Sequence, residues 1–109
     1  MHSDHPITDY VAVLVDGAQF VDVREPDEVA GGTLPGTLNI PLGQIPNRLG
    51  ELDPNQRVVV MCRSGGRSTQ AAEILTAAGF ADVINLAGGW LAWDKAQKPQ
   101  SGGFFSRFR

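Results

Sequence analysis

Five residues in the middle of the chain, RVVVM at positions 57–61, limit its possible folds most strongly. After the arginine they are apolar in succession rather than alternating, which is typical of a strand buried on both faces. The next segment, 67–80, has apolar residues at helical spacing and a glycine near its end. Strand-like runs also occupy 19–23, 37–40 and 82–87. Strands joined by helical crossovers form a largely parallel sheet covered on both faces, so we expect an α/β fold.

The segments between and after these strands are expected to supply the covering helices, over 25–32, 43–52 and 88–97. Segment 7–17 is rich in β-branched residues, but its apolar residues recur at helical spacing, and we favour a helix there. Because the chain has only 109 residues, we expect one domain over 1–98. The composition changes after Pro99, so we expect 99–109 to form a flexible tail.

The overall composition argues against several classes of function. The net charge is −3, whereas nucleic-acid binding usually needs a basic face. No apolar run approaches the ~20 residues that span a bilayer, so we expect no membrane partner. The chain has a single cysteine and cannot form an internal disulfide, which favours a cytoplasmic location. His2 and His5 lie in an N-terminal segment that we expect to be solvated and frayed, so we predict no metal site and no cofactor.

The single cysteine, Cys62, stands directly after the strand 57–61 and before the helix-like segment 67–80. A lone cysteine is most often a small core residue, but ligand sites in open parallel sheets gather where strands end. The glycines after it allow backbone N–H groups to point at one centre, and a helix N-terminus and arginines add positive charge. These features lower the pKa of a thiol, so the sequence predicts a nucleophilic thiolate. The predicted loop consists of Arg63, Ser64, Gly65, Gly66, Arg67 and Ser68.

Other thiol and glycine-rich motifs do not fit this loop. A phosphate-binding P-loop needs a glycine and a lysine where this chain has Met61 and Arg67. A dithiol redox motif needs a second cysteine. A papain-like thiol needs an activating histidine, and both histidines lie in the N-terminal segment.

The loop CRSGGRS resembles the active-site loop of rhodanese-like sulfurtransferases. Three further stretches agree with the family's motifs: FVDVREPDEVAGGTLPGTLNIPL, the strand and loop RVVVMCRSGGRS, and AGFADVINLAGGWLAW. The resemblance covers roughly residues 8–95 in the same order, and four motifs in register make it specific. It implies a three-layer α/β/α fold with a central, mainly parallel five-stranded sheet.

The resemblance also implies a ping-pong sulfur transfer. The Cys62 thiolate would take sulfane sulfur from a donor such as thiosulfate, and an acceptor would then remove it from a Cys62 persulfide. The acceptor is expected to be cyanide, a small-molecule thiol or a protein thiol. We expect the backbone N–H groups from Arg63 to Ser68 to hold the persulfide. We expect Arg67 to fix the loop and help to bind anions, and Arg63, nearer the mouth, to meet the anionic donor.

Two other functions compete with sulfur transfer. One alternative is the thiol chemistry of cysteine-dependent phosphatases or arsenate reductases. The phosphatase motif is C-x5-R, with five residues between cysteine and arginine, whereas four residues separate Cys62 from Arg67 here. The shorter loop suits one extra sulfur atom better than a tetrahedral phosphate, and no aspartate can be assigned as general acid. The third possibility is a non-enzymatic module that carries sulfur or binds a protein partner, although Cys62 and the intact loop argue against an inactive module.

Several residues outside the loop are candidates for supporting roles. Asp22 and Arg24 project on the same side of their strand and could be an ordinary ion pair, but the resemblance suggests that they brace the active-site region together with Glu28. Thr33 stands where the family usually has histidine, and Thr37 stands where it usually has alanine. These two departures leave the hydrogen bonding of their loop open.

Two aromatic features lie near the C-terminus, a pair of tryptophans and a phenylalanine-rich end. Trp90 and Trp93 could form a substrate wall, but apolar residues at helical spacing are usually core. The final residues FFSRFR could dock on a partner or on the domain itself, and disorder or simple packing is an equal alternative.

Overall fold

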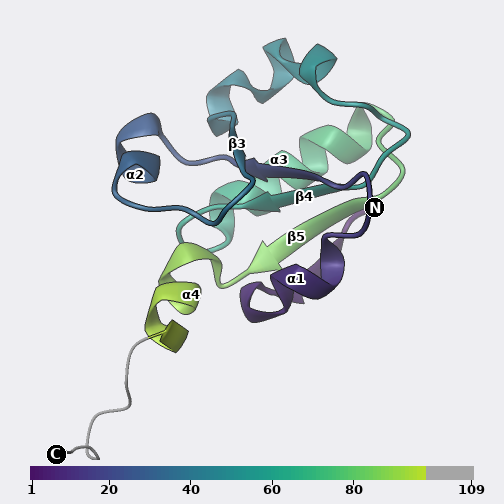
Figure 1. The fold of residues 1–109 in the computed structure, drawn as a ribbon. Helices are drawn as coiled ribbons and strands as arrows, with labels where there is room; N and C mark the ends of the chain where they lie inside the picture. Colours follow the sequence, from purple (N-terminus) through teal and green to yellow (C-terminus); the bar gives the residue numbers. More distant parts are fainter. Residues whose placement is uncertain (98–109) are drawn as a thin grey trace, which may run out of the picture.

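The computed structural model describes residues 1–97, which form a five-stranded sheet in the order β1-β5-β4-β2-β3 (Figure 1). Every pair of neighbouring strands is parallel. The strands are β1 (Ser3–Pro6), β2 (Gln19–Asp22), β3 (Leu38–Asn39), β4 (Val58–Met61) and β5 (Val83–Ala87). The parallel α/β fold predicted from the sequence is therefore confirmed.

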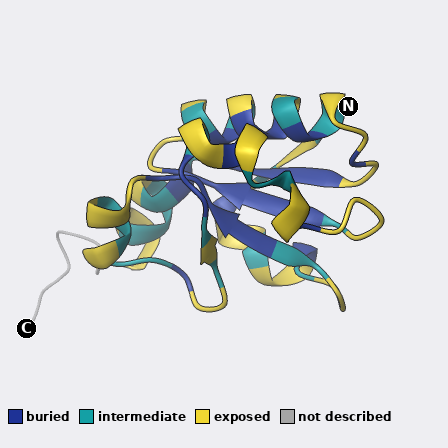
Figure 2. Ribbon diagram, turned by 90° about the horizontal axis from the view of Figure 1, so that it is seen from above, coloured by how far each residue is buried: buried dark blue, intermediate teal, exposed yellow. Residues whose placement is uncertain are grey.

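Helices cover both faces of this sheet, and the strands form a buried middle layer (Figure 2). One core cluster joins the sheet to α3, η2 and η3, and a second joins the opposite face to η1, α1 and α4. Figure 1 shows α2 and α4 beyond the carboxyl ends of the strands. The α-helices are α1 (Tyr10–Val13), α2 (Pro26–Ala30), α3 (Gly66–Ala77) and α4 (Gly89–Gln97), and the 3-10 helices are η1 (Ile7–Asp9), η2 (Leu42–Asn47) and η3 (Leu49–Glu51).

The central strand β4 has the burial that its sequence predicts. Its four residues are each 0% exposed. Val58 and Val60 belong to the cluster on the α3 side, while Val59 and Met61 belong to the cluster on the α4 side. Successive side chains point to opposite faces of a strand, and Cys62 continues the alternation on the α3 side.

The predicted helices are present, with three local differences. The segment 43–52 forms the 3-10 helices η2 and η3 because Pro46 lies inside η2 and cannot donate a backbone hydrogen bond to a continuous α-helix. In α3 the buried residues include Ser68 and Ala72, whereas Ala78, an apolar residue of the predicted helical segment 67–80, is exposed just after the helix end. Segment 7–17 is helical as favoured, but only over η1 and α1.

The expectation of a frayed N-terminal segment is wrong. Residues Ser3–Pro6 form the edge strand β1 and pair in register with Ile84–Ala87 of β5. Most side chains of β1 are exposed and polar, so the sequence carries no apolar pattern for this strand. Backbone hydrogen bonds to β5 hold β1 in place, and side-chain patterns do not predict such bonds.

The two tryptophans of α4 pack against the core cluster that α4 shares with α1. The rings of Trp93 and Tyr10 meet edge to face with centroids 5.0 Å apart. Both side chains are half-buried and cover the core, which agrees with the core interpretation, and the substrate wall stays a prediction. Within residues 1–97, no helix combines the length and apolar character needed to cross a membrane. The predicted tail, with its FFSRFR sequence, lies outside the described residues.

Candidate active site

The thiol of Cys62 lies at the carboxyl end of the middle strand of the sheet, directly after β4 and before α3. It is unpaired and only 1% exposed. Ligand sites in open parallel sheets occur outside the carboxyl ends of the strands, where loops converge. The position predicted from the sequence is therefore a place where a reactive group can meet a ligand.

Hydrogen-bond donors surround the sulfur of Cys62. The Gly65 N–H donates to Sγ at 3.0 Å, and the Ser68 hydroxyl lies 3.3 Å from Sγ. Burial by itself raises the pKa of the thiol, but hydrogen bonds from the Ser68 hydroxyl and from the backbone N–H groups of Ser68, Gly65 and Ser64 outweigh burial and lower the pKa of Cys62. The loop thus favours the thiolate without a histidine.

The loop obtains its shape from Gly65, which precedes the first residue of α3. Its φ of 110° lies in a region that favours glycine, and this backbone turn directs its N–H towards Sγ. The Gly65 carbonyl accepts hydrogen bonds from the Thr69 N–H at 3.1 Å and from the Thr69 hydroxyl at 2.8 Å. The start of α3 therefore holds the carbonyl of this glycine, while its N–H is directed to the sulfur.

The beginning of α4 supports the opposite side of the loop. The Trp90 N–H donates to the Cys62 carbonyl at 2.8 Å, and the Leu91 N–H donates to the Arg63 carbonyl at 2.9 Å. Gly89 lies so close to these carbonyls that a Cβ atom there would overlap them. The two N–H groups belong to the first turn of α4, where helix donors lack internal partners, so the loop and the helix satisfy each other.

The two arginines of the loop have different environments. Arg67 donates from both terminal nitrogens to the Glu28 carboxylate of α2, at 2.6 and 2.8 Å. This pairing lowers the pKa of Glu28 to about 2. The Arg63 side chain is exposed and has no hydrogen bond or ion pair within residues 1–97.

The predicted supporting residues Asp22 and Arg24 form a buried ion pair, with the two shortest atoms 2.7 Å apart and side-chain exposures of 0% and 3%. Arg24 also donates to the Gly32 carbonyl at 2.7 Å, and its guanidinium lies 5.3 Å from the centroid of the Trp90 ring. Thr33 donates its hydroxyl to Asp22 Oδ2 at 2.7 Å. The pair therefore contacts α4 through Trp90 rather than the thiol itself.

The structure therefore groups the predicted residues differently from the sequence interpretation. Glu28 was expected to act with Asp22 and Arg24, but its carboxylate binds Arg67, and Arg24 reaches only its carbonyl, at 3.5 Å. Thr33 stands where the family usually has histidine, and the sequence left the hydrogen bonding at this position open. In the structure the Thr33 hydroxyl donates to Asp22.

Sequence reasoning missed three residues that surround the loop, Thr69, Asn85 and Leu91, and it missed the backbone contact of Trp90. Thr69 and Asn85 lie next to each other behind the loop, joined by a 3.2 Å hydrogen bond. Trp90 and Leu91 donate their N–H groups to the loop carbonyls. A hydroxyl in the first turn of the helix and an asparagine within an apolar strand were the available signals for Thr69 and Asn85. No comparable signal reveals a backbone contact.

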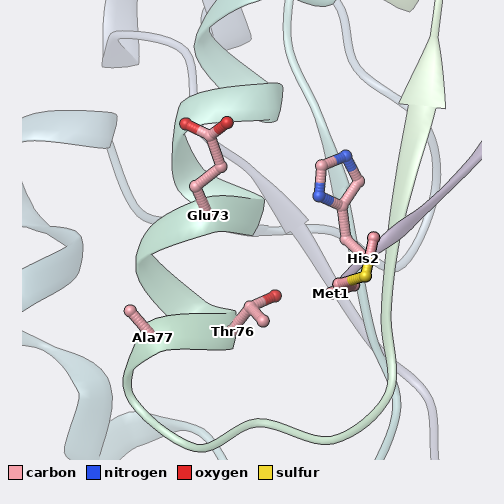
Figure 3. Close-up of a pocket in the computed structure, with 5 residues that line it drawn as sticks. All are labelled: Met1, His2, Glu73, Thr76 and Ala77. Carbon is pink, nitrogen blue, oxygen red and sulfur yellow. The ribbon is translucent and has the colours of Figure 1, made fainter.

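A separate cavity of about 390 Å³ lies between the N-terminal segment and the C-terminal half of α3 (Figure 3). It is lined by Met1, His2, Glu73, Thr76 and Ala77. None of these residues belongs to the Cys62 loop, which precedes the other end of α3. The reactive thiol of Cys62 therefore lies outside this cavity.

No group of three or more histidine, cysteine or acidic residues in the described part of the chain is arranged to hold a metal ion.

A parallel α/β sheet whose central strand delivers a buried thiol into a loop of N–H donors defines a cysteine-based, anion-stabilising α/β domain. The family model for the rhodanese-like domain matches residues 8–96, and the chain belongs to that family. This membership agrees with the resemblance of its four motifs and with its five-stranded parallel sheet.

Known proteins of similar sequence and fold include sulfurtransferases. A sulfurtransferase of Allochromatium vinosum is 43% identical over 79 residues, which cover 72% of this chain and 74% of that protein. A rhodanese-like domain protein of Staphylococcus aureus is 33% identical with a TM-score of 0.75, covering 85% of this chain and 91% of that one. The human single-domain sulfurtransferase TSTD1 is 25% identical with a TM-score of 0.73, covering 87% and 97%. These similarities support sulfur transfer as the general chemistry of the chain.

Proposed function

We propose that this chain is a thiosulfate sulfurtransferase that carries sulfane sulfur as a persulfide on Cys62. The central observation is the environment of the buried sulfur: the Gly65 N–H donates to it at 3.0 Å, and the Ser68 hydroxyl lies 3.3 Å away. Donors in these positions stabilise an anion on the first sulfur and are close to the place of a second. We assign Cys62 as nucleophile and the backbone from Arg63 to Ser68 as the persulfide-binding loop.

The first half-reaction loads the sulfur. The Cys62 thiolate attacks the outer sulfur of thiosulfate, the bond between the two thiosulfate sulfurs breaks, and its electron pair leaves with sulfite. Cys62 then carries an anionic persulfide. Arg63, exposed and without a side-chain partner in residues 1–97, is the cation we assign to meeting the donor dianion.

The second half-reaction regenerates the thiolate. Cyanide or a thiolate acceptor attacks the outer sulfur of the persulfide, and the sulfur–sulfur bond breaks. Thiocyanate or the persulfide of the acceptor leaves, and the electron pair returns to Cys62. Charge and electrons balance in both steps without a further reactant.

The environment of Arg67 favours sulfur transfer over phosphate chemistry. A phosphatase arginine must offer its guanidinium to the phosphate oxygens, whereas both terminal nitrogens of Arg67 bind Glu28. The four-residue spacing from Cys62 to Arg67 also leaves a smaller ring of N–H donors. Hydrolysis of an aryl phosphate that disappears in Cys62→Ala would support the phosphatase or arsenate reductase alternative instead.

Intact-protein mass spectrometry after thiosulfate treatment tests the proposal. The protein should gain the mass of one sulfur atom, and subsequent cyanide should remove it as thiocyanate. Because Cys62 is the single cysteine of the chain, Cys62→Ser is a complete control and should gain nothing. Absence of both adduct and thiocyanate would overturn the proposal. Stable loading with no transfer to cyanide or thiols would instead indicate a sulfur-carrying module.

Three further expectations remain predictions alongside this function. They are the domain boundary after residue 98, the cytoplasmic location, and the absence of nucleic-acid and membrane partners. A protein thiol is included among the acceptors that the loading assay should compare with cyanide and small thiols.

A further inference from the structure

Asn85 of β5 is a polar residue in an apolar part of the sheet and is only 3% exposed. It lies in register with Asp4 of β1 on one side and Val60 of β4 on the other. Its amide nitrogen donates to Asp4 Oδ1 at 3.1 Å and to Thr69 Oγ1 at 3.2 Å. The amide oxygen of Asn85 has no hydrogen-bond partner among residues 1–97.

The carboxylate of Asp4 explains the orientation of this amide. An ionised carboxylate only accepts hydrogen bonds, so the side of Asn85 that faces Asp4 must be its NH2 group. The opposite orientation would place the amide oxygen against the carboxylate, acceptor against acceptor. An unpartnered buried acceptor is unfavourable, which indicates that the contacts made by the NH2 group compensate for it.

The hydrogen bond that the Asn85 amide donates to Thr69 Oγ1 determines the direction of the Thr69 hydroxyl proton. Thr69 Oγ1 accepts from the Asn85 amide, and its own proton points to the Gly65 carbonyl, 2.8 Å away. The same carbonyl accepts from the Thr69 N–H at 3.1 Å. A carbonyl oxygen has two lone pairs, and these two donors occupy both.

Ser68 is the residue that this arrangement affects. Its hydroxyl is completely buried and has two candidate acceptors, the Gly65 carbonyl at 3.2 Å and Cys62 Sγ at 3.3 Å. The hydroxyl has a single proton. When Thr69 occupies both lone pairs of the Gly65 carbonyl, the sulfur is the remaining acceptor for that proton.

We propose that Thr69 and Asn85 are positioning residues, which act through the Gly65 carbonyl to direct the Ser68 hydroxyl proton to the Cys62 sulfur. The inference rests on the proposed function only for the use of the thiolate. Its geometry is independent of which donor supplies sulfur. Asp4, on the edge strand β1, belongs to the same relay because it orients the Asn85 amide.

The charged groups around the thiol are the same in every variant that tests this relay. They are Arg63 of the loop, Arg67 of α3, Glu28 of α2, and the pair formed by Asp22 at the end of β2 and Arg24 just after it. Neither Thr69 nor Asn85 carries a charge, so a change in the Cys62 thiolate on substituting them reports hydrogen bonding rather than altered net charge.

The test is the pH profile of iodoacetamide alkylation of the single cysteine in Thr69→Val. Loss of the hydroxyl leaves a lone pair of the Gly65 carbonyl free to compete for the Ser68 proton. We expect the pKa of Cys62 to rise by up to about one unit, which lowers the alkylation rate below the wild-type pKa by up to about tenfold. Thr69→Ser keeps the hydroxyl and should restore the wild-type profile. Asn85→Leu should move the profile in the same direction as Thr69→Val.

Thr76→Val is a matched control for Thr69→Val. Thr76 lies in the same helix and donates its hydroxyl to the Ala72 carbonyl at 2.8 Å, the same distance and the same spacing of four residues. It is two turns further along α3, so its substitution should leave the alkylation profile unchanged. Thermal unfolding of each variant identifies any that fails to fold, and Asn85→Leu provides the second measurement in that case.

An unchanged profile in folded Thr69→Val, an equal shift in Thr76→Val, or failure of Thr69→Ser to restore the profile would each overturn the relay. These outcomes are distinct from failure of the proposed function. If wild-type protein takes no sulfur from thiosulfate, the proposed function fails and the alkylation profile still tests the relay. If wild type and Thr69→Val load sulfur and have the same profile, only the relay fails.

Discussion

Gly89→Ala should show how strongly the contact between α4 and the active-site loop stabilises the protein. Gly89 has a φ of +59°, and a Cβ atom there would overlap the Cys62 carbonyl oxygen and lie 2.7 Å from the carbonyl carbon and oxygen of Arg63. These are backbone atoms and cannot rotate away as a flexible side chain can. The first turn of α4 must therefore move off the loop.

The magnitude follows from what this movement breaks. Placing an L-residue in the left-handed region lowers the free energy of unfolding by about 1–2 kcal/mol. The hydrogen bonds from Trp90 and Leu91 to the carbonyls of Cys62 and Arg63 contribute about 1 kcal/mol each. The loss of stability should be about 3–4 kcal/mol, a large share of the roughly 5–15 kcal/mol of a typical domain. At about 4–8 °C per kcal/mol, Tm should fall by at least about 12 °C.

Urea unfolding of Gly89→Ala and Gly79→Ala measures the contribution of the contact. Gly79 also has a positive φ, +98°, but a Cβ atom there would have nothing within 4 Å. Gly79→Ala should therefore lose only the conformational part, about 1–2 kcal/mol. Folded Gly89→Ala should also load sulfur more slowly because its loop carbonyls have lost their donors. Equal losses of stability in the two glycine variants would show that the contact between α4 and the loop contributes nothing beyond the backbone conformation.

Three further predictions concern the ion pairs and the threonine near the loop. Arg67→Ala should impair thiosulfate loading more than Arg63→Ala, because Arg67 holds the loop to Glu28 and Arg63 meets only donor charge; equal effects on loading kinetics would contradict this division. The pKa of Glu28 is lowered from 4.5 to about 2, so the ionised carboxylate stabilises the fold above pH 4.5. This contribution, about 1 kcal/mol after solvent screening, is lost as the pH falls from 4.5 to 2. Glu28→Gln should flatten the stability curve in that window, and an unchanged slope in acid unfolding would argue against it. Thr33→Val should cost about 1–3 kcal/mol in urea unfolding because the buried Asp22 carboxylate loses a donor, whereas Thr33→Ser should cost much less.

Local sequence patterns were sufficient for the centre of this fold. The unbroken apolar run of β4 predicts burial on both faces, and the helical spacing after it predicts α3. The position of Cys62 between them predicts a thiol at the carboxyl end of a central strand. The polar strand β1 could not be predicted in this way, because an exposed edge strand depends on backbone pairing and not on side-chain periodicity.

The surroundings of the loop were less predictable than the loop. Asp22 ends β2 and Arg24 follows two residues later, and their shared orientation follows from the period of two of an extended backbone. The partner of Glu28 does not follow, because Arg67 is 39 positions away in the sequence. Glu28 and Arg67 meet because α2 and the start of α3 both follow strands that end at the same edge of the sheet.

The alternation of strands and helices, the strand buried on both faces, and the single thiol before a glycine-rich turn can all be read from the order of residues. These are properties of consecutive residues, and hydrophobic periodicity and backbone freedom express them locally. Which hydrogen-bonding groups meet depends on the folded chain: Ser68 and Gly65 at the sulfur, α4 at the loop carbonyls, and Asn85 at Thr69. These contacts join residues that are distant in the sequence, so they exist only after parallel crossovers bring the carboxyl ends of separate strands to one edge of the sheet.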